Sequence, residues 1–140
     1  SEHTIGGEHG VMEMHAVFGS QEGTNLVVGM LFELGWYNNP FIQKLIDAGL
    51  PETSESEPTE TTDLINLADA FTDTKSYYTY GGSLTTPPCS QTVTWVVLTQ
   101  PARLHRNQLN EFRRILGNNF RPVQPLNQRV VRITKPSHGK

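Results

Sequence analysis

The hydrophobic and polar residues between positions 11 and 34 alternate in a way that predicts two neighbouring strands. From 11 to 18 the even positions are all apolar, whereas the odd positions are Val11, Glu13, His15 and Val17. A period of two places these sets on opposite faces of a strand, so the even face is expected in the core. The odd face then brings Glu13 and His15 side by side. A hairpin-type connection at 21–25 leads into the apolar run 26–34, which is typical of a buried strand.

Two helices are predicted by their end signals and their spacing. Asn39 suits the N-cap of the first helix, Pro40 suits its first position, and Gly49 ends it. The second helix is predicted over 107–116, before Gly117. Its inner side is expected to hold four apolar residues: Leu109, Phe112, Ile115 and Leu116.

The rest of the chain favours strands and loops. Residues 51–62 are polar, acidic and interrupted by two prolines, which indicates a solvated surface loop. Residues 64–67 are interpreted as a brief strand, 92–98 as a buried strand and 129–133 as the last strand. We find no internal repeat. The pattern therefore predicts a mainly β (α+β) fold, with a large central sheet and short peripheral helices.

Composition removes several classes of function. A chain of 140 residues is one domain's worth of sequence. Its net charge of −3 comes from scattered charges of both signs, so no basic stripe is present to bind nucleic acid. No apolar run approaches the roughly 18 residues of a membrane span. Cys89 is the only cysteine, so it cannot form an internal disulfide.

The stretch 80–98 carries the densest local signals. Gly81-Gly82 permits a turn, and Pro87-Pro88 fixes φ directly before a β-branched and aromatic run. We interpret 80–89 as a rigid loop that presents Leu84, Thr85 and Thr86. Loop chemistry alone favours a structural turn between two strands.

The motif Tyr-x-Gly-Ser-Leu-Thr-Thr-Pro-Pro-Cys at 80–89, followed by Val-x-Trp at 93–95, resembles the active-site loop of α-class carbonic anhydrases. The resemblance extends to Ser-Glu-His-Thr-Ile at 1–5, Met-Glu-Met-His at 12–15 and Phe-Arg-Pro-Val-Gln-Pro-Leu-Asn at 120–127. It implies that family's twisted, mostly antiparallel sheet, incomplete in this chain. Residues 1–140 would be the C-terminal portion of a single domain, without the N-terminal His-x-His strand and without the usual proton-shuttle histidine.

The resemblance also indicates the cellular compartment in which the protein is expected. Bacterial and secreted members often pair a cysteine at the position of Cys89 with one near their N-terminus. A periplasmic or secreted location is therefore expected.

His15 is the principal candidate for chemistry. A lone histidine in a strand is ordinarily a hydrogen-bonded core residue. Glu13 on the same face favours ligation, since metal-bound imidazoles commonly give their second N–H to a carboxylate. The resemblance implies that His15 is the third Zn²⁺ ligand and Glu13 the acid behind it. Three neutral histidines would leave the fourth zinc position to water, whose pKa falls to about 7.

Thr85 and Glu2 form the second implied pair. The resemblance makes Thr85 the gatekeeper threonine, whose hydroxyl accepts a hydrogen bond from zinc-bound hydroxide. A hydroxyl has one proton to donate, and Thr85 would give it to Glu2. Local sequence alone indicates only an ordinary exposed acid at Glu2. His3 looks like a structural histidine that supports this network.

Carbon dioxide is uncharged, so its site should be an apolar pocket beside the metal. The resemblance assigns this wall to Val17, Val27, Leu84, Val93 and Trp95. Thr86 is assigned to the hydrophilic side of the cavity. For the three valines, periodicity alone favours a plain core role nearly as well. The remaining histidines are expected at the surface: His9, His105 and His138.

The function that the resemblance implies is zinc-dependent, reversible hydration of carbon dioxide to bicarbonate and a proton, through zinc-bound hydroxide. It also implies an esterase side activity. Sulfonamides and anions are the implied inhibitors. The alternative is a non-catalytic carbonic anhydrase-related binding domain, or an inactive fragment that needs a partner segment to complete its zinc site. The partners considered are a second copy in a homodimer or a complementing N-terminal segment.

Overall fold

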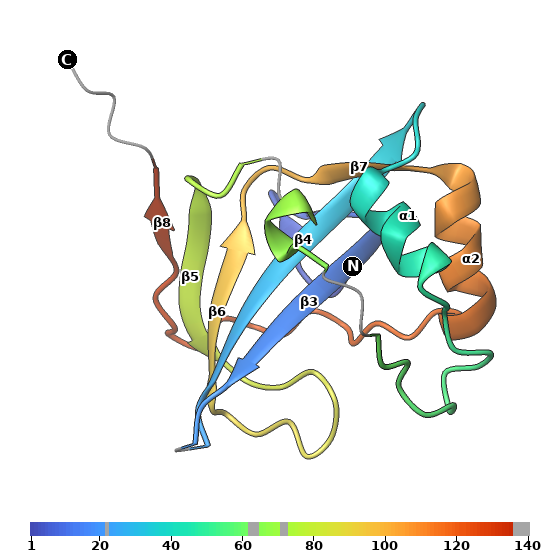
Figure 1. Cartoon of the computed structure of the whole chain (residues 1–140). Coiled ribbons are helices and arrows are strands. Elements are labelled where there is room, and N and C mark those ends of the chain that lie inside the picture. The colour runs from blue at the N-terminus through green and yellow to red at the C-terminus, as the bar shows by residue number, and fades with distance from the viewer. Residues whose placement is uncertain (22, 62–64, 71–72, 136–140) are drawn as a thin grey trace.

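The computed structural model describes residues 1–21, 23–61, 65–70 and 73–135, and its centre is a six-stranded sheet. Five of the strands follow the order β3-β4-β6-β5-β8 (Figure 1). Their bounds are β3 Met12–Gly19, β4 Asn25–Gly35, β5 Tyr77–Gly82, β6 Val93–Leu98 and β8 Arg132–Thr134. The sixth strand, β7 (Ala102–His105), pairs with the far end of β4.

Strand β4 organises the sheet because it has three partners. It pairs antiparallel with β3, and parallel with β6 and then β7 along its length. Strand β5 is antiparallel to both β6 and β8. The predicted mainly β class with peripheral helices is confirmed. The sheet is mixed, since the two parallel pairings of β4 lie among antiparallel ones.

Both helices cover one face of this sheet. Helix α1 (Pro40–Asp47) and helix α2 (Arg106–Leu116) lie side by side, with a short 3₁₀ helix, η1 (Leu67–Ala70), close to α1 (Figure 1). The core beneath them is continuous and apolar, and its largest members are Met30, Phe32, Phe41, Ile42, Leu98, Leu104 and Leu109. Asn39 caps α1 as predicted, because its side-chain oxygen accepts from the backbone N–H groups of Phe41 and Ile42.

Gln108, a buried polar side chain of α2, joins the two helices. Gln108 is 3% exposed, and its amide oxygen accepts from the backbone N–H of Asn39 at 2.8 Å and of His105 at 3.2 Å. Its amide nitrogen donates to the Asn39 carbonyl at 3.0 Å and to Gln43 at 3.2 Å. His105 in turn caps α2, accepting from Asn107 at 3.3 Å. The prediction of a plain surface role for His105 is therefore wrong.

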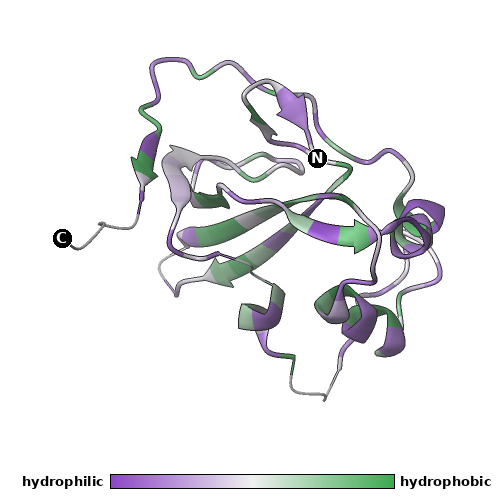
Figure 2. Ribbon diagram, turned by 90° about the horizontal axis from the view of Figure 1, so that it is seen from above, coloured by the Kyte–Doolittle hydropathy of each residue, from purple (hydrophilic) through white to green (hydrophobic). Residues whose placement is uncertain are grey.

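The other face of the sheet carries the N-terminal hairpin. Strands β1 (Thr4–Ile5) and β2 (Glu8–His9) form a short antiparallel hairpin. In the view from above, the helices lie on one side of the sheet and this hairpin on the other (Figure 2). A second apolar cluster lies on the hairpin side, and its buried members are Val27, Leu31, Val93, Trp95 and Val97.

Three details differ from the predicted elements. The brief strand at 64–67 is wrong: Asn66 accepts from the backbone of residues 68 and 69 and so starts the 3₁₀ turn, while residue 64 lies outside the described part. Gly81 and Gly82 belong to β5 rather than to a loop, since they pair with β6. Leu116, the last residue of α2, is 38% exposed instead of buried.

Strand β3 forms one edge of the sheet. Within the described residues it pairs only with β4, so its outer backbone groups have no strand partner. Large apolar side chains at this edge are exposed, among them Val17 at 59%, Phe18 at 47% and Leu26 at 41%. The even face of β3 was expected in the core; Met12 and Met14 pack there, whereas Phe18 does not. No helix in the described ranges is long and apolar enough to cross a membrane.

Candidate metal centre

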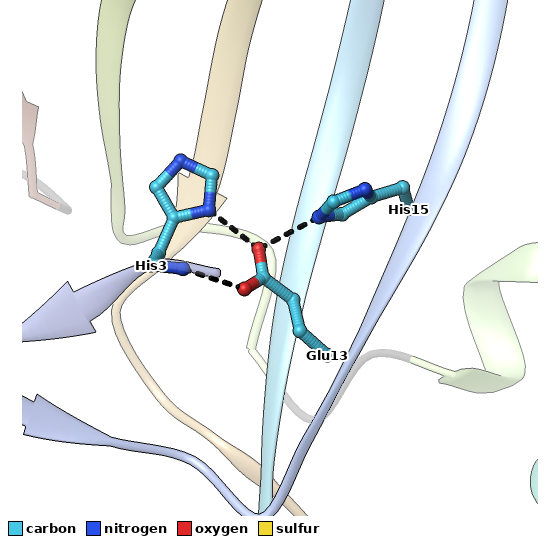
Figure 3. A group of neighbouring side chains, drawn as sticks. All are labelled: His3, Glu13 and His15. Carbon is cyan, nitrogen blue, oxygen red and sulfur yellow. Dashed lines mark hydrogen bonds and ion pairs between the residues drawn. The ribbon is translucent and has the colours of Figure 1, made fainter. Parts of the chain in front are cut away.

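Three side chains on the hairpin side of the sheet place their donor atoms within 4.8 Å of one another: His3, Glu13 and His15. Glu13 and His15 share the odd face of β3, as the alternation predicts, and His3 comes from the segment directly before β1. Glu13 lies between the two imidazoles (Figure 3). Its side chain is only 2% exposed, against 17% for His3 and 22% for His15.

The Glu13 carboxylate is fully hydrogen-bonded. Its Oε1 accepts from His3 Nδ1 at 2.5 Å and from His15 Nε2 at 2.9 Å. Its Oε2 accepts from the backbone N–H groups of Glu2 and His3, both at 2.8 Å. A carboxylate offers about four lone-pair sites, and these four donors fill them. Glu13 therefore has no electron pair left for a metal ion.

These hydrogen bonds decide the ionisation of Glu13. Burial works to raise the pKa of this carboxyl, but the side-chain hydrogen bonds from His15 and His3 outweigh it, helped by the backbone N–H of His3 and by the charge of its ring when protonated. The pKa of Glu13 is consequently held well below its usual value of 4.5. The centre therefore contains a permanent buried negative charge that fixes the nitrogen atoms around it.

His3 is likewise committed at both ring nitrogens. Its Nδ1 faces the Glu13 carboxylate, which can only accept, so this nitrogen carries a proton. Its Nε2 lies 2.7 Å from the Tyr80 hydroxyl. Burial raises the pKa of Tyr80 to about 12, partly against the charge of Arg129, so the phenol keeps its proton to donate. His3 in its neutral form therefore has no free lone pair.

His15 is different because only one of its nitrogens is bonded. Nε2 donates to Glu13, which leaves Nδ1 as the unprotonated nitrogen of the neutral ring. The nearest acid to Nδ1 is Glu2 Oε2 at 3.9 Å, beyond hydrogen-bond distance. Of the three clustered residues, His15 is thus the one whose donor set fits a metal ligand, with Glu13 behind it. The residues fit the carboxylate–histidine arrangement that accompanies bound zinc.

A glycine in β4 makes room for this arrangement. Gly29 lies directly opposite His15 in the β3–β4 register. A Cβ atom at Gly29 would lie 3.0 Å from Glu13 Oε1 and 3.6 Å from the Trp95 ring. A glycine inside an apolar strand often marks such a close approach. This signal was available in the sequence and was not used.

Glu2 and Thr85 both line one cavity of about 1160 Å³ on this side of the sheet. The expected hydrogen bond between them is absent from the described structure. Glu2 Oε1 instead accepts from the backbone N–H of Arg121 at 2.9 Å. Leu84 and Thr85 are half-buried, whereas Thr86 is exposed and does not line the cavity.

The predicted apolar wall is only partly brought together. Val27, Val93 and Trp95 are buried in one cluster, and Leu84 packs against it. The Trp95 ring is centred 4.8 Å from the rings of both His3 and His15. Val17 shares the face of His15 but is 59% exposed at the sheet edge.

The remaining candidates lie away from this cluster. Cys89 is half-buried with a positive φ of 57°, and it forms no disulfide within the described residues. His9 is exposed, as predicted, and its Nδ1 contacts the Ser1 carbonyl at 2.9 Å. His138 lies outside the described residues.

Comparisons with known proteins show which family shares this sequence and fold. A family profile described as eukaryotic-type carbonic anhydrase matches residues 1–135. A carbonic anhydrase of Klebsiella pneumoniae is 42% identical over 132 residues, which cover 94% of this chain and 52% of that protein. Carbonic anhydrase 4 of Mus musculus is 38% identical, covering 94% of this chain and 49% of that protein.

Solved structures of carbonic anhydrases are also similar to this chain. The α-carbonic anhydrase of Thermovibrio ammonificans, determined with the inhibitor sulfanilamide, superposes with a TM-score of 0.84 at 40% identity, covering 94% of this chain and 57% of that one. A hyperthermostable carbonic anhydrase from a hydrothermal vent chimney gives 0.85 at 39% identity, covering 96% and 60%. The chain spans about half the length of the curated relatives it matches. Sequence, fold and profile together assign this chain to the family of eukaryotic-type carbonic anhydrases.

Proposed function

We propose that this chain contributes one half of the centre of a zinc-dependent carbonic anhydrase, which interconverts carbon dioxide and bicarbonate. The observation that carries the proposal is the hydrogen-bonding of the three clustered side chains. It leaves His15 Nδ1 as the one uncommitted ligand atom among His3, Glu13 and His15. Zinc, when bound, supplies Lewis acidity that lowers the pKa of a water molecule to about 7.

The chain's own residues have separate roles in this proposal. Glu13 holds the tautomer of His15 and makes its imidazole more basic. Thr85 is proposed to accept a hydrogen bond from the water oxygen, and Glu2, which lines the same cavity, to accept the hydrogen bond that Thr85 donates. Val27, Val93 and Trp95 give uncharged carbon dioxide an apolar surface, with Leu84 beside them and Val17 at the rim. Thr86 is exposed and stays outside the cavity lining, so the proposal assigns it no contact with the substrate.

In this proposal the other ligands come from outside the described residues. A catalytic zinc site uses three protein ligands, and this chain offers His15 alone from the cluster. The open outer edge of β3, which carries His15, is the place where a further strand could add its ligands beside it. That strand belongs to the same polypeptide, to a complementing segment or to a second copy.

The same observation favours a second candidate. With one free ligand atom, the 140 residues by themselves would be an inactive, zinc-free module or a non-catalytic binding domain. The two proposals differ in whether zinc is present in the working protein. Sulfonamide and anion inhibition belongs only to the first, and the Thermovibrio ammonificans relative was solved with sulfanilamide. The periplasmic or secreted location stays a prediction.

The decisive experiment measures zinc content, carbon dioxide hydration and intact mass on the protein as isolated from its source. One zinc per domain with fast hydration supports the enzyme. Zinc-free, inactive protein at the mass of 140 residues supports the second candidate.

The ligand assignment has its own test in the active protein. His15→Ala should abolish zinc retention and hydration, because the site loses a nitrogen that no neighbour can replace. The matched control is His9→Ala, which removes an exposed imidazole of the β1–β2 hairpin and should leave both quantities unchanged. Near-normal zinc content in His15→Ala would show that His15 is not a ligand.

A further inference from the structure

The side chain of Arg129 lies where the C-terminal segment meets the sheet. Its guanidinium carbon is 5.4 Å from the centre of the Tyr80 ring. Its Nε donates to the Leu126 carbonyl and its Nη2 to the Pro125 carbonyl, both at 2.8 Å. One delocalised cation therefore closes a turn of its own segment and attaches that turn to an aromatic face.

The segment that Arg129 holds has no regular structure. We call residues 121–129 the C-terminal strap; they contain no helix or strand. At its first residue, the backbone N–H of Arg121 donates to Glu2 Oε1 at 2.9 Å. The strap thus contacts the metal centre region at both ends, through Glu2 and through Tyr80. Since no backbone ladder fixes the strap, these contacts hold its position, together with the bond from Arg121 Nη1 to Ser83 Oγ at 3.4 Å.

Tyr80 continues the connection towards the centre. Its ring is stacked on Trp95, with 6.5 Å between ring centres and 12° between planes. Its hydroxyl lies 2.7 Å from His3 Nε2. His3 then shares the single oxygen Oε1 of Glu13 with His15. A change in the tilt of the Tyr80 ring therefore reaches the hydrogen bond that selects the tautomer of His15.

We propose that Arg129 is a positioning residue for His15, acting through Tyr80, His3 and Glu13, so that docking of the C-terminal strap and alignment of the ligand imidazole are one coupled event. The importance of His15 rests on the proposed function, but the coupling does not. It is a property of the metal-free chain, so its test stands or falls separately from the zinc experiment.

The test uses imidazole ¹⁵N NMR and amide hydrogen exchange on the protein as isolated, stripped of any bound metal, at a fixed, mildly alkaline pH. In the unmodified protein, His15 should be protonated at Nε2 and His3 at Nδ1. Arg129→Gln should accelerate amide exchange in the strap about tenfold, the loss expected for one cation–π contact. It should also move the two ¹⁵N resonances of His15 towards each other, as its tautomers mix.

Two further variants make the result specific. Arg129→Lys keeps a cation over the ring and should restore part of the His15 signature, which a purely structural defect would not do. Arg132→Gln removes an exposed arginine of β8 and should leave both readouts unchanged. His15 resonances that stay at their unmodified positions in Arg129→Gln, whether or not the strap loosens, would overturn the proposal.

If Arg129→Gln does not fold, Tyr80→Phe tests the coupling between the strap and His15. It keeps the aromatic face under Arg129 and removes only the hydroxyl that contacts His3. Strap exchange should then stay slow while the His15 resonances shift. Unchanged His15 resonances in Tyr80→Phe would equally refute the coupling.

Discussion

Glu13 determines the chemistry of the centre although it does not touch the proposed ion. Its two oxygens accept four hydrogen bonds, two from imidazoles and two from backbone N–H groups. A side chain at position 13 must therefore be able to accept all four of these hydrogen bonds. Glutamine is nearly the same shape but would turn an NH₂ group towards donors, which leaves buried groups unpaired.

Glu13→Gln should accordingly lower the free energy of unfolding by about 2 kcal/mol or more at pH 5. The pKa of Glu13 is depressed in the folded state, so its stabilisation is present above the usual value of 4.5 and is lost as the pH falls below it. The difference between the two proteins should therefore shrink at pH 3. Urea titrations at both pH values measure it.

The control for this prediction is Glu33→Gln, which changes an acid that is 55% exposed and 4.0 Å from Arg103. Its effect should stay within about 0.5 kcal/mol at either pH. An equal loss of stability for Glu13→Gln at pH 5 and pH 3 would contradict the ionised, fully bonded carboxylate.

At the scale of the elements, β5 depends on a glycine for its contact with β6. A Cβ atom at Gly82 would lie 2.8 Å from Trp95 Cδ1 and 2.9 Å from Tyr80 Cε2. Gly82→Ala should therefore displace one of these rings and destabilise the fold by about 1–3 kcal/mol. Gly81→Ala is the matched control, because nothing lies within 4 Å of its Cβ position. Thermal unfolding followed by circular dichroism compares them, and equal melting temperatures would contradict the close contact.

Elements with strong local signals were predicted from the sequence, and those that depend on distant contacts were not. The alternation with a period of two predicts strand β3, and Asn39 followed by Pro40 predicts the start of α1. Strand β7 has only four residues, too few to show a period. The predicted loop at 80–89 overlaps the end of β5, because glycines are also typical of turns. The glycine at 82 serves a cross-strand contact that no local pattern records.

The residues of the metal centre divide in the same way, into those that local sequence predicts and those that depend on distant contacts. Glu13 and His15 are two residues apart, so alternation alone placed them on one face. The contact between His3 and Tyr80 joins residues 77 positions apart, and that between Glu2 and Arg121 spans 119. No local rule links such pairs. The family resemblance supplied Glu2 but gave no reason to single out Tyr80 or Arg129.

At the scale of the whole molecule, the edge formed by β3 should govern how the chain associates. Its outer side has no strand partner in the described structure, and Phe18 on it is 47% exposed. An open apolar edge is a template for pairing with another chain, and lysine on an edge strand opposes it. The 140-residue chain should therefore self-associate, and Phe18→Lys should weaken association about tenfold, or ~1.4 kcal/mol.

Sedimentation velocity over a range of concentrations measures this association. Leu116→Lys is the matched control, since it places the same charge at an exposed apolar position on the end of α2. A fully monomeric unmodified chain, or equal weakening by both lysines, would show that the β3 edge is not the contact.

The position of Trp95 gives the molecule an optical property of its own. The chain has two tryptophans, and they differ sharply in environment: Trp95 is 3% exposed, whereas Trp36 is 90% exposed. The indole of Trp95 also lies against both imidazoles of the centre. Its blue-shifted emission should respond to any charge that arrives at His15, while the red-shifted emission of Trp36 stays constant. Trp95 should therefore serve as an intrinsic fluorescent probe of the centre, and Trp36 as an internal reference in the same chain.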